Sequence, residues 1–123
     1  MVDTPRKNIL IVDDDPFLTE MYTLSLTRSN VHIDVVHDGK QAIAFVEKQQ
    51  PDLMLLDLLM PVMDGFHVLA ELEKKATTFP VIVLSNIAEK KDQDRCIKLG
   101  AVDFFSKGET DLEKLRLKVE KYL

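Results

Sequence analysis

The apolar run Leu53–Leu56 is the feature that most limits how this chain can fold. It lacks the polar/apolar alternation of a half-exposed strand, so it predicts a strand covered on both faces. The run stops at Asp57, where the strand would leave the core. Because ligands of open α/β sheets bind beside the carboxyl ends of the strands, Asp57 is a candidate functional residue. The alternative is an ordinary aspartate that caps a turn.

Four more segments have strand patterns: Lys7–Val12, Val31–Val36, Pro80–Leu84 and Ala101–Phe105. Val31–Val36 alternates in polarity and is expected at an exposed edge. Segments with helical spacing or helix-capping residues follow all five strand patterns. Alternation of this kind predicts an α/β fold in which five helices cover both faces of a parallel sheet.

The first helix is expected to begin at Pro16, with Asp15 as its N-cap. Phe17, Met21 and Leu24 have the spacing of a core-facing stripe, and the apolar Leu18 and Leu26 lie beside it. The capping pairs expected for three later helices are Asp38 with Gln41, Asn86 with Glu89, and Thr110 with Glu113.

The fourth helix, expected to end at Gly100, has the weakest apolar pattern of the five. Its first half, Glu89–Arg95, is almost wholly charged and offers little to a core. Cys96, further along the same helix, is expected to be a small buried apolar residue.

Length and charge exclude several classes of protein. The 123 residues suit one domain, and the net charge of −5 argues against sequence-independent nucleic-acid binding, which needs a basic face. No apolar run approaches membrane-spanning length. The single cysteine, Cys96, has no partner for an internal disulfide, and a reduced, cytoplasmic setting is expected.

Asp57, Met60–Pro61 and Met63–Gly65 resemble the D-x-x-M-P-x-M-D-G signature of the receiver domain of two-component response regulators. The resemblance covers nearly the whole chain, so residues 1–123 are expected to form one receiver domain. It implies a flavodoxin-like, doubly wound, five-stranded parallel sheet in the order 2-1-3-4-5.

In that order the first and third strands are neighbours, and Asp13, Asp14 and Asp57 converge at their ends. Two carboxylates about 4 Å apart repel by roughly 4 kcal/mol at an effective dielectric constant near 20. Such a cluster must hold protons, bind a cation or be neutralised by a lysine. Mg²⁺ suits it, because this ion prefers one or two carboxylates together with waters and a phosphate.

Ser85 and Lys107 follow the fourth and fifth strand patterns and should point at the same crevice. A lysine ammonium suits a phosphoryl oxygen, and a serine hydroxyl can donate a hydrogen bond to another. The receiver resemblance implies that Asp57 accepts a phosphoryl group and that Ser85 and Lys107 contact it. It also implies that Asp13, Asp14, Asp57 and the backbone carbonyl of Leu59 bind Mg²⁺.

The implied function is signal transduction in a phosphorelay. A sensor histidine kinase or a phosphotransfer protein would supply the phosphoryl group, and the domain would catalyse its own modification without being a turnover enzyme. A downstream effector would bind the face formed by the fourth helix, the fifth strand and the fifth helix, where Phe104 matches an aromatic switch position. Direct binding to nucleic acid or to a membrane is not expected.

Three other kinds of protein share parts of this pattern. Haloacid-dehalogenase-type phosphatases need a second aspartate where this chain has Leu59, and flavodoxins need a hydroxyl- and glycine-rich loop where it has acids. A pseudo-receiver, which binds partners without being phosphorylated, stays open because of two departures from the family pattern. Gly108 replaces the usual proline after Lys107, and Asn86 replaces a small residue. Without proline a cis bond costs about 2.5–4 kcal/mol, so the Lys107–Gly108 peptide is expected to be trans.

Overall fold

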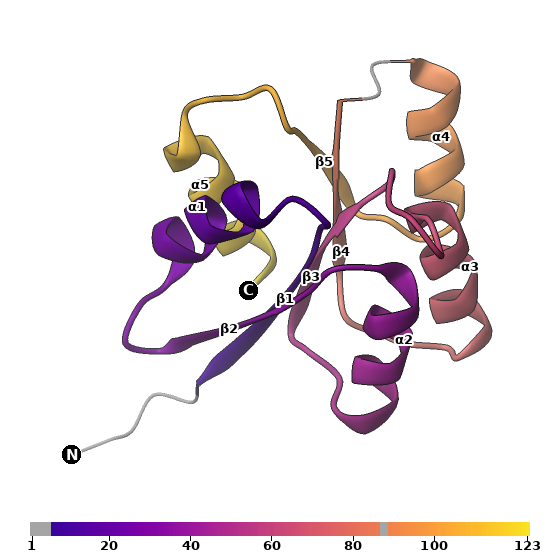
Figure 1. Cartoon of the computed structure of the whole chain (residues 1–123), viewed down its shortest axis with the longest axis horizontal. Helices are drawn as coiled ribbons and strands as arrows, with labels where there is room; N and C mark the ends of the chain where they lie inside the picture. Colours follow the sequence, from indigo (N-terminus) through magenta and orange to yellow (C-terminus); the bar gives the residue numbers. More distant parts are fainter. Residues whose placement is uncertain (1–5, 87–88) are drawn as a thin grey trace.

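The computed structural model describes residues 6–86 and 89–123 (Figure 1). Its five strands pair in parallel in the order β2-β1-β3-β4-β5, as predicted. The edge position of β2 is also confirmed. The strands are β1 (Lys7–Val12), β2 (Val31–Val36), β3 (Leu53–Asp57), β4 (Val81–Ser85) and β5 (Asp103–Ser106).

Helices cover both faces of this sheet. In Figure 1, α1 and α5 lie on one side, and α2, α3 and α4 lie on the other. The helices are α1 (Pro16–Leu26), α2 (Gly39–Lys48), α3 (Gly65–Lys74), α4 (Lys90–Lys98) and α5 (Leu112–Tyr122).

Strand β3 shows why its sequence lacks alternation. Leu53 and Leu55 belong to the core beneath α1 and α5, whereas Met54 and Leu56 belong to the core beneath α2, α3 and α4. All four side chains are fully buried. Burying a large apolar side chain contributes about 1.5–3 kcal/mol, so β3 anchors both layers and fixes the position of the residue that ends it.

The predicted inner face of α1 is confirmed only in part: Leu26 is buried and Leu18 packs against the core, but the stripe of Phe17 and Leu24 points outward. Phe17 and Leu24 are 68% and 74% exposed, and the buried residues of this helix are Thr19, Tyr22 and Leu26. Thr19 can be buried because its hydroxyl donates a 3.0 Å hydrogen bond to the carbonyl of Pro16, which leaves no unpaired polar group.

Two of the predicted N-caps are confirmed. The carboxylate of Asp15 accepts hydrogen bonds from the backbone N–H groups of Phe17 and Leu18 at 2.9 and 3.2 Å. Asp38 accepts one from the N–H of Gln41 at 2.8 Å. Each cap satisfies N–H groups that the first turn of a helix leaves unpaired.

The other two predicted caps need correction. Asp111, not Thr110, is the N-cap of α5, and it accepts a 3.1 Å hydrogen bond from the N–H of Glu113. Helix α4 has Glu89 as its N-cap and no side-chain capping bond, so Asn86 does not cap it; residues 87 and 88 lie outside the described part of the chain.

Helix α4 is weakly anchored, as its charged sequence predicted. Cys96 is its buried residue. The chain leaves the helix through Gly100, whose φ of +108° lies in the left-handed region that favours glycine. Within residues 6–86 and 89–123, no helix has the length and apolar content to cross a membrane.

Candidate functional site at the carboxyl ends of the strands

Three aspartates meet where β1 and β3 end. The two strands are neighbours, with Val12 paired to Leu56, so the residues that follow them share one edge of the sheet. One carboxylate oxygen from each of Asp13, Asp14 and Asp57 lies within 4.8 Å of the others. Asp13 and Asp57 are buried, whereas Asp14 is exposed. The predicted acidic cluster is therefore present, with one side open to solvent.

Lys107 supplies a positive charge to this cluster. Its Nζ lies 3.2 Å from Oδ2 of Asp57 and 3.2 Å from both carboxylate oxygens of Asp13. Of the two Asp13 oxygens, only Oδ1 has hydrogen-bonding geometry toward Lys107; the buried Oδ2 accepts no hydrogen bond from the described residues. Three carboxylates thus share one ammonium, and the buried Oδ2 of Asp13 lies near its charge without accepting a hydrogen bond from the described part of the chain.

Backbone N–H groups fix the two buried carboxylates. The N–H of Asp15 donates to Oδ1 of Asp13 at 3.0 Å, and the N–H of Leu59 donates to Oδ1 of Asp57 at 3.2 Å. Each bond spans two residues and turns the carboxylate back toward its own loop. The sequence did not reveal these contacts.

The electrostatics follow from burial and from the excess of acids. Burial raises the pKa of Asp57 to about 6, and the charge of Asp13 adds to the effect; Lys107 and the N–H of Leu59 offset only part of it. Burial lowers the pKa of Lys107, but the carboxylates of Asp13 and Asp57 outweigh burial and raise the pKa above its usual value. Lys107 therefore stays charged, and Asp57 holds its proton more tightly than an exposed aspartate does.

The donor set fits a hard divalent cation. It consists of oxygen atoms, it carries excess negative charge, and it includes the buried Oδ2 of Asp13, which has no hydrogen-bond donor among the described residues. The exposed Asp14 leaves an open side for waters or a phosphate. Mg²⁺ prefers these surroundings over a closed protein cage.

Ser85 ends β4 at the same edge. It is 5% exposed, and its backbone carbonyl accepts a 3.2 Å hydrogen bond from the N–H of Lys107. The structure therefore gathers Asp13, Asp14, Asp57 and Lys107 at one place and hydrogen-bonds the backbone of Ser85 to that of the lysine. Leu59 lies on the adjoining loop with its side chain 64% exposed.

Gly65 is a further residue on which this loop depends. A Cβ at this position would lie 2.6 Å from the carbonyl oxygen of Asp57 and 2.7 Å from Cα of Leu58, closer than real Cβ atoms approach. The N–H of Gly65 donates to the carbonyl of Leu58 at 2.9 Å, and Asp64 caps α3 through the N–H of His67. The Asp-Gly pair of the signature thus starts α3 directly against the backbone of the acidic residue.

The Lys107–Gly108 peptide is trans, as predicted; the described residues contain no cis bond. The lysine nonetheless reaches both buried carboxylates.

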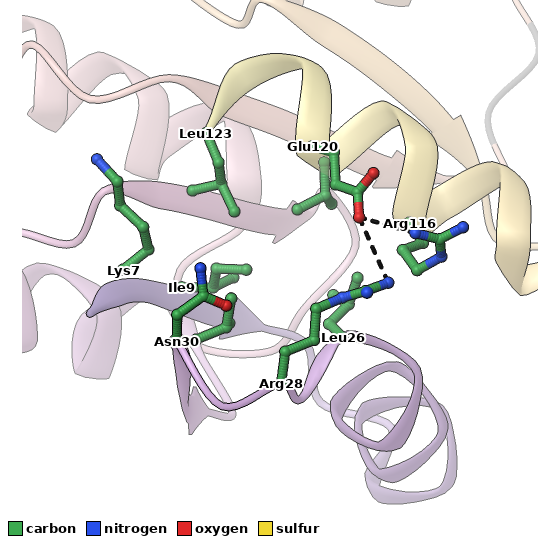
Figure 2. A pocket seen from close by; sticks show the side chains of 10 residues that line it. Lys7, Ile9, Leu26, Arg28, Asn30, Arg116, Glu120 and Leu123 are labelled. Carbon is green, nitrogen blue, oxygen red and sulfur yellow. Dashed lines mark hydrogen bonds and ion pairs between the residues drawn. The ribbon is translucent and has the colours of Figure 1, made fainter. Parts of the chain in front are cut away.

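A cavity lies at the opposite end of the strands from the acidic cluster, beside the first residues of β1 and β2 (Figure 2). It has a volume of about 240 Å³ and a floor that includes Ile9 and Leu26. Arg28 and Arg116 both pair with Glu120 over it, at 3.4 and 2.8 Å. None of the acidic-cluster residues lines this cavity.

Comparison with known proteins decides the family. Residues 9–120 match the family described as Response regulator receiver domain. The chain belongs to this family.

Individual relatives agree with this receiver assignment. The chain is 33% identical to the alkaline phosphatase synthesis transcriptional regulatory protein PhoP of Bacillus subtilis over 83% of its own length and 42% of the relative's. It is 38% identical to the response regulator GtcR of Aneurinibacillus migulanus over 87% of its own length and 44% of the relative's. The receiver domain thus spans less than half the length of these relatives.

Among solved structures, the receiver domain of a putative Luxo repressor protein from Vibrio parahaemolyticus superposes with a TM-score of 0.90. That domain is 28% identical, and the match covers 95% of this chain and 89% of the other.

Proposed function

We propose that this receiver domain accepts a phosphoryl group on Asp57 from the phosphohistidine of a sensor histidine kinase or a phosphotransfer protein. The observation that carries the proposal is the cluster itself. The buried carboxylate of Asp57 faces the partly buried ammonium of Lys107 at 3.2 Å, and oxygens of Asp13 and Asp14 lie within 4.8 Å of a carboxylate oxygen of Asp57. Membership of the response regulator family supports phosphorelay signalling as the general role.

The residues have distinct parts in the transfer. An ionised oxygen of Asp57 attacks the phosphorus; a new P–O bond forms while the P–N bond breaks, and its electron pair returns to the imidazole nitrogen. Lys107 stabilises charge on the phosphoryl oxygens, and the hydroxyl of Ser85 donates a hydrogen bond to one of them.

Mg²⁺ would be held by Asp13, Asp14, Asp57 and the backbone carbonyl of Leu59. It would supply positive charge that lets an anionic donor approach three carboxylates. The Oδ2 of Asp13, which accepts no hydrogen bond from the described residues, and the open side at Asp14 support this assignment.

The wider role follows from the same chemistry. Residues 1–123 would act as one cytoplasmic receiver domain that is modified and later hydrolysed, rather than as a turnover enzyme. Partners would be the phosphoryl donor and a downstream effector on the α4–β5–α5 face, with no direct contact to nucleic acid or membrane.

Intact mass spectrometry after treatment with acetyl phosphate and Mg²⁺ tests the proposal. Wild-type protein should gain one phosphoryl group, and Asp57→Ala should gain none. An unmodified wild type would contradict phosphorylation. It would favour the pseudo-receiver alternative, which Asn86 and Gly108 keep open, and partner binding would then be equal in wild type and Asp57→Ala.

A further inference from the structure

The turn that carries Lys107 is held by a set of hydrogen bonds centred on Ser106. The N–H of Gly108 donates to Oγ of Ser106 at 3.2 Å, and the N–H of Glu109 donates to the backbone carbonyl of Ser106 at 3.1 Å. The N–H of Lys107 itself donates to the carbonyl of Ser85. Three successive N–H groups are therefore engaged, two of them by a single residue.

Gly108 is not needed for its conformational freedom. Its φ lies outside the left-handed region, and a Cβ there would find its nearest neighbours, Oγ of Ser106 and Oδ1 of Asn86, at 3.6 and 3.9 Å. These are ordinary van der Waals distances. What Gly108 offers that a proline would not is an N–H group.

The Ser106 hydroxyl uses that N–H group. A serine side chain that accepts from the N–H two residues later closes a compact turn, and this turn encloses Lys107. A lysine side chain has a long flexible stem, so placing its ammonium 3.2 Å from two buried carboxylates requires a fixed backbone at its root. Asn86 and Gly108, the two residues that depart from the family signature, are neighbours at this turn. Oδ1 of Asn86 would lie 3.9 Å from a Cβ added at Gly108.

We infer that Ser106 is a positioning residue for Lys107: its hydroxyl, through the N–H of Gly108, holds the turn that proline would otherwise shape. The inference rests on the proposed phosphorylation of Asp57 for its functional consequence. Ser106 acts through Lys107 and does not touch the reacting atoms.

The test compares rates of Asp57 labelling by acetyl phosphate with Mg²⁺. Ser106→Ala should slow labelling about two- to tenfold, the range expected for one hydrogen bond. Ser106→Thr, which keeps the hydroxyl, should restore the rate. Gly108→Ala keeps the N–H and adds a Cβ that the site accommodates, so it should label at close to the wild-type rate.

A double variant separates positioning from general damage. In a Lys107→Ala background, Ser106→Ala should cause no further loss, because the side chain that Ser106 positions is already gone. Labelling of Ser106→Ala at the wild-type rate would overturn the inference. An equal loss with and without Lys107 would do the same.

Amide hydrogen exchange distinguishes failure of this inference from failure of the proposed function. If wild type is never labelled, the proposed function fails, and the exchange rate of the Gly108 amide still tests the turn. Ser106→Ala should accelerate that exchange, and Ser106→Thr should not. Equal exchange in wild type and Ser106→Ala would show that the hydroxyl does not hold the turn.

Discussion

The Nζ of Lys107 lies 3.2 Å from Oδ2 of Asp57, although 50 residues separate the two in the chain. Both side chains are largely buried, at 13% and 3% exposure. Asp13 shares the same ammonium, so the cluster remains short of positive charge. We therefore expect the stability of the metal-free protein to depend on Lys107 and on pH.

Removing the ammonium should destabilise the fold. Lys107→Met leaves two buried carboxylates facing each other, and we expect a loss of about 2–4 kcal/mol in the free energy of unfolding at pH 8 without metal. Urea denaturation measures it. The loss should shrink when Mg²⁺ is added, and also as the pH falls and Asp57 takes up a proton, because removing Lys107 takes away a charge that lowers the pKa of Asp57. A loss independent of pH and Mg²⁺ would mean that Lys107 contributes by packing alone.

Replacing Asp57 by asparagine should stabilise the metal-free protein at neutral pH. The folded state binds the Asp57 proton more tightly than the unfolded chain, since burial raises the pKa from 3.8 to about 6. That contribution to stability is complete below pH 4 and is lost as the pH rises to about 6. Asp57→Asn should therefore gain about 1–3 kcal/mol at pH 7.5. Thermal unfolding from pH 4 to 8 should show wild type losing stability relative to the variant.

Asp14 should matter for labelling and little for folding. It is exposed, so Asp14→Ala should unfold at close to the wild-type temperature, yet lose Mg²⁺-dependent labelling by acetyl phosphate. Asp34→Ala, on the edge strand β2 and outside the acidic cluster, is a control and should label normally. Full labelling of wild type in EDTA would refute the metal assignment.

Gly65→Ala should be costly. The added methyl group would overlap the backbone of Asp57 and Leu58, and we expect a loss of about 1–3 kcal/mol together with slower labelling. Gly108→Ala, where the nearest atom is 3.6 Å away, should cost little by comparison. Equal costs in urea denaturation would show that the β3–α3 loop can move aside.

Signalling should spread from Ser85 to the α4–β5–α5 face. Phe104 is partly buried against the core beneath α4, and Lys118 holds its carbonyl at 2.6 Å. Because Cys96 is its buried residue and it has no side-chain cap, we expect α4 to shift between two positions. NMR with beryllofluoride, a phosphoryl mimic, should show shift changes concentrated in residues 85–108. Changes confined to the neighbours of Asp13, Asp14 and Asp57 would mean that the domain binds the group without relaying it.

The site was more predictable than the helices around it. The carboxyl ends of parallel strands lie along one edge of the sheet. The polar residues that follow the apolar runs are therefore expected at that edge: Asp13, Asp57, Ser85 and Lys107. The strand order was not contained in these local patterns and came from the receiver signature. The hydrogen bonds from the N–H groups of Asp15 and Leu59 could not be predicted, because every residue except proline has a backbone N–H group and the loop conformation decides which one donates.

The rotation of α1 could not be read from its sequence, because two apolar stripes compete. Phe17, Met21 and Leu24 fit one face, whereas Tyr22 and Leu26 fit another. The stripe patterns do not include the preceding loop, in which Asp13 is buried and Asp15 caps the helix. Cap positions near Thr110 were wrong by one residue, since neighbouring polar residues can each accept from the first turn.

The position of Lys107 along the chain also affects how the protein is made. It lies 94 residues after Asp13, and synthesis delivers both buried acids long before their counter-charge. Until β5 emerges from the ribosome, closing β1 against β3 would bury two carboxylates without the lysine. We expect these acids to stay protonated or solvated until then, so that completion of the sheet and neutralisation of its acidic edge occur together.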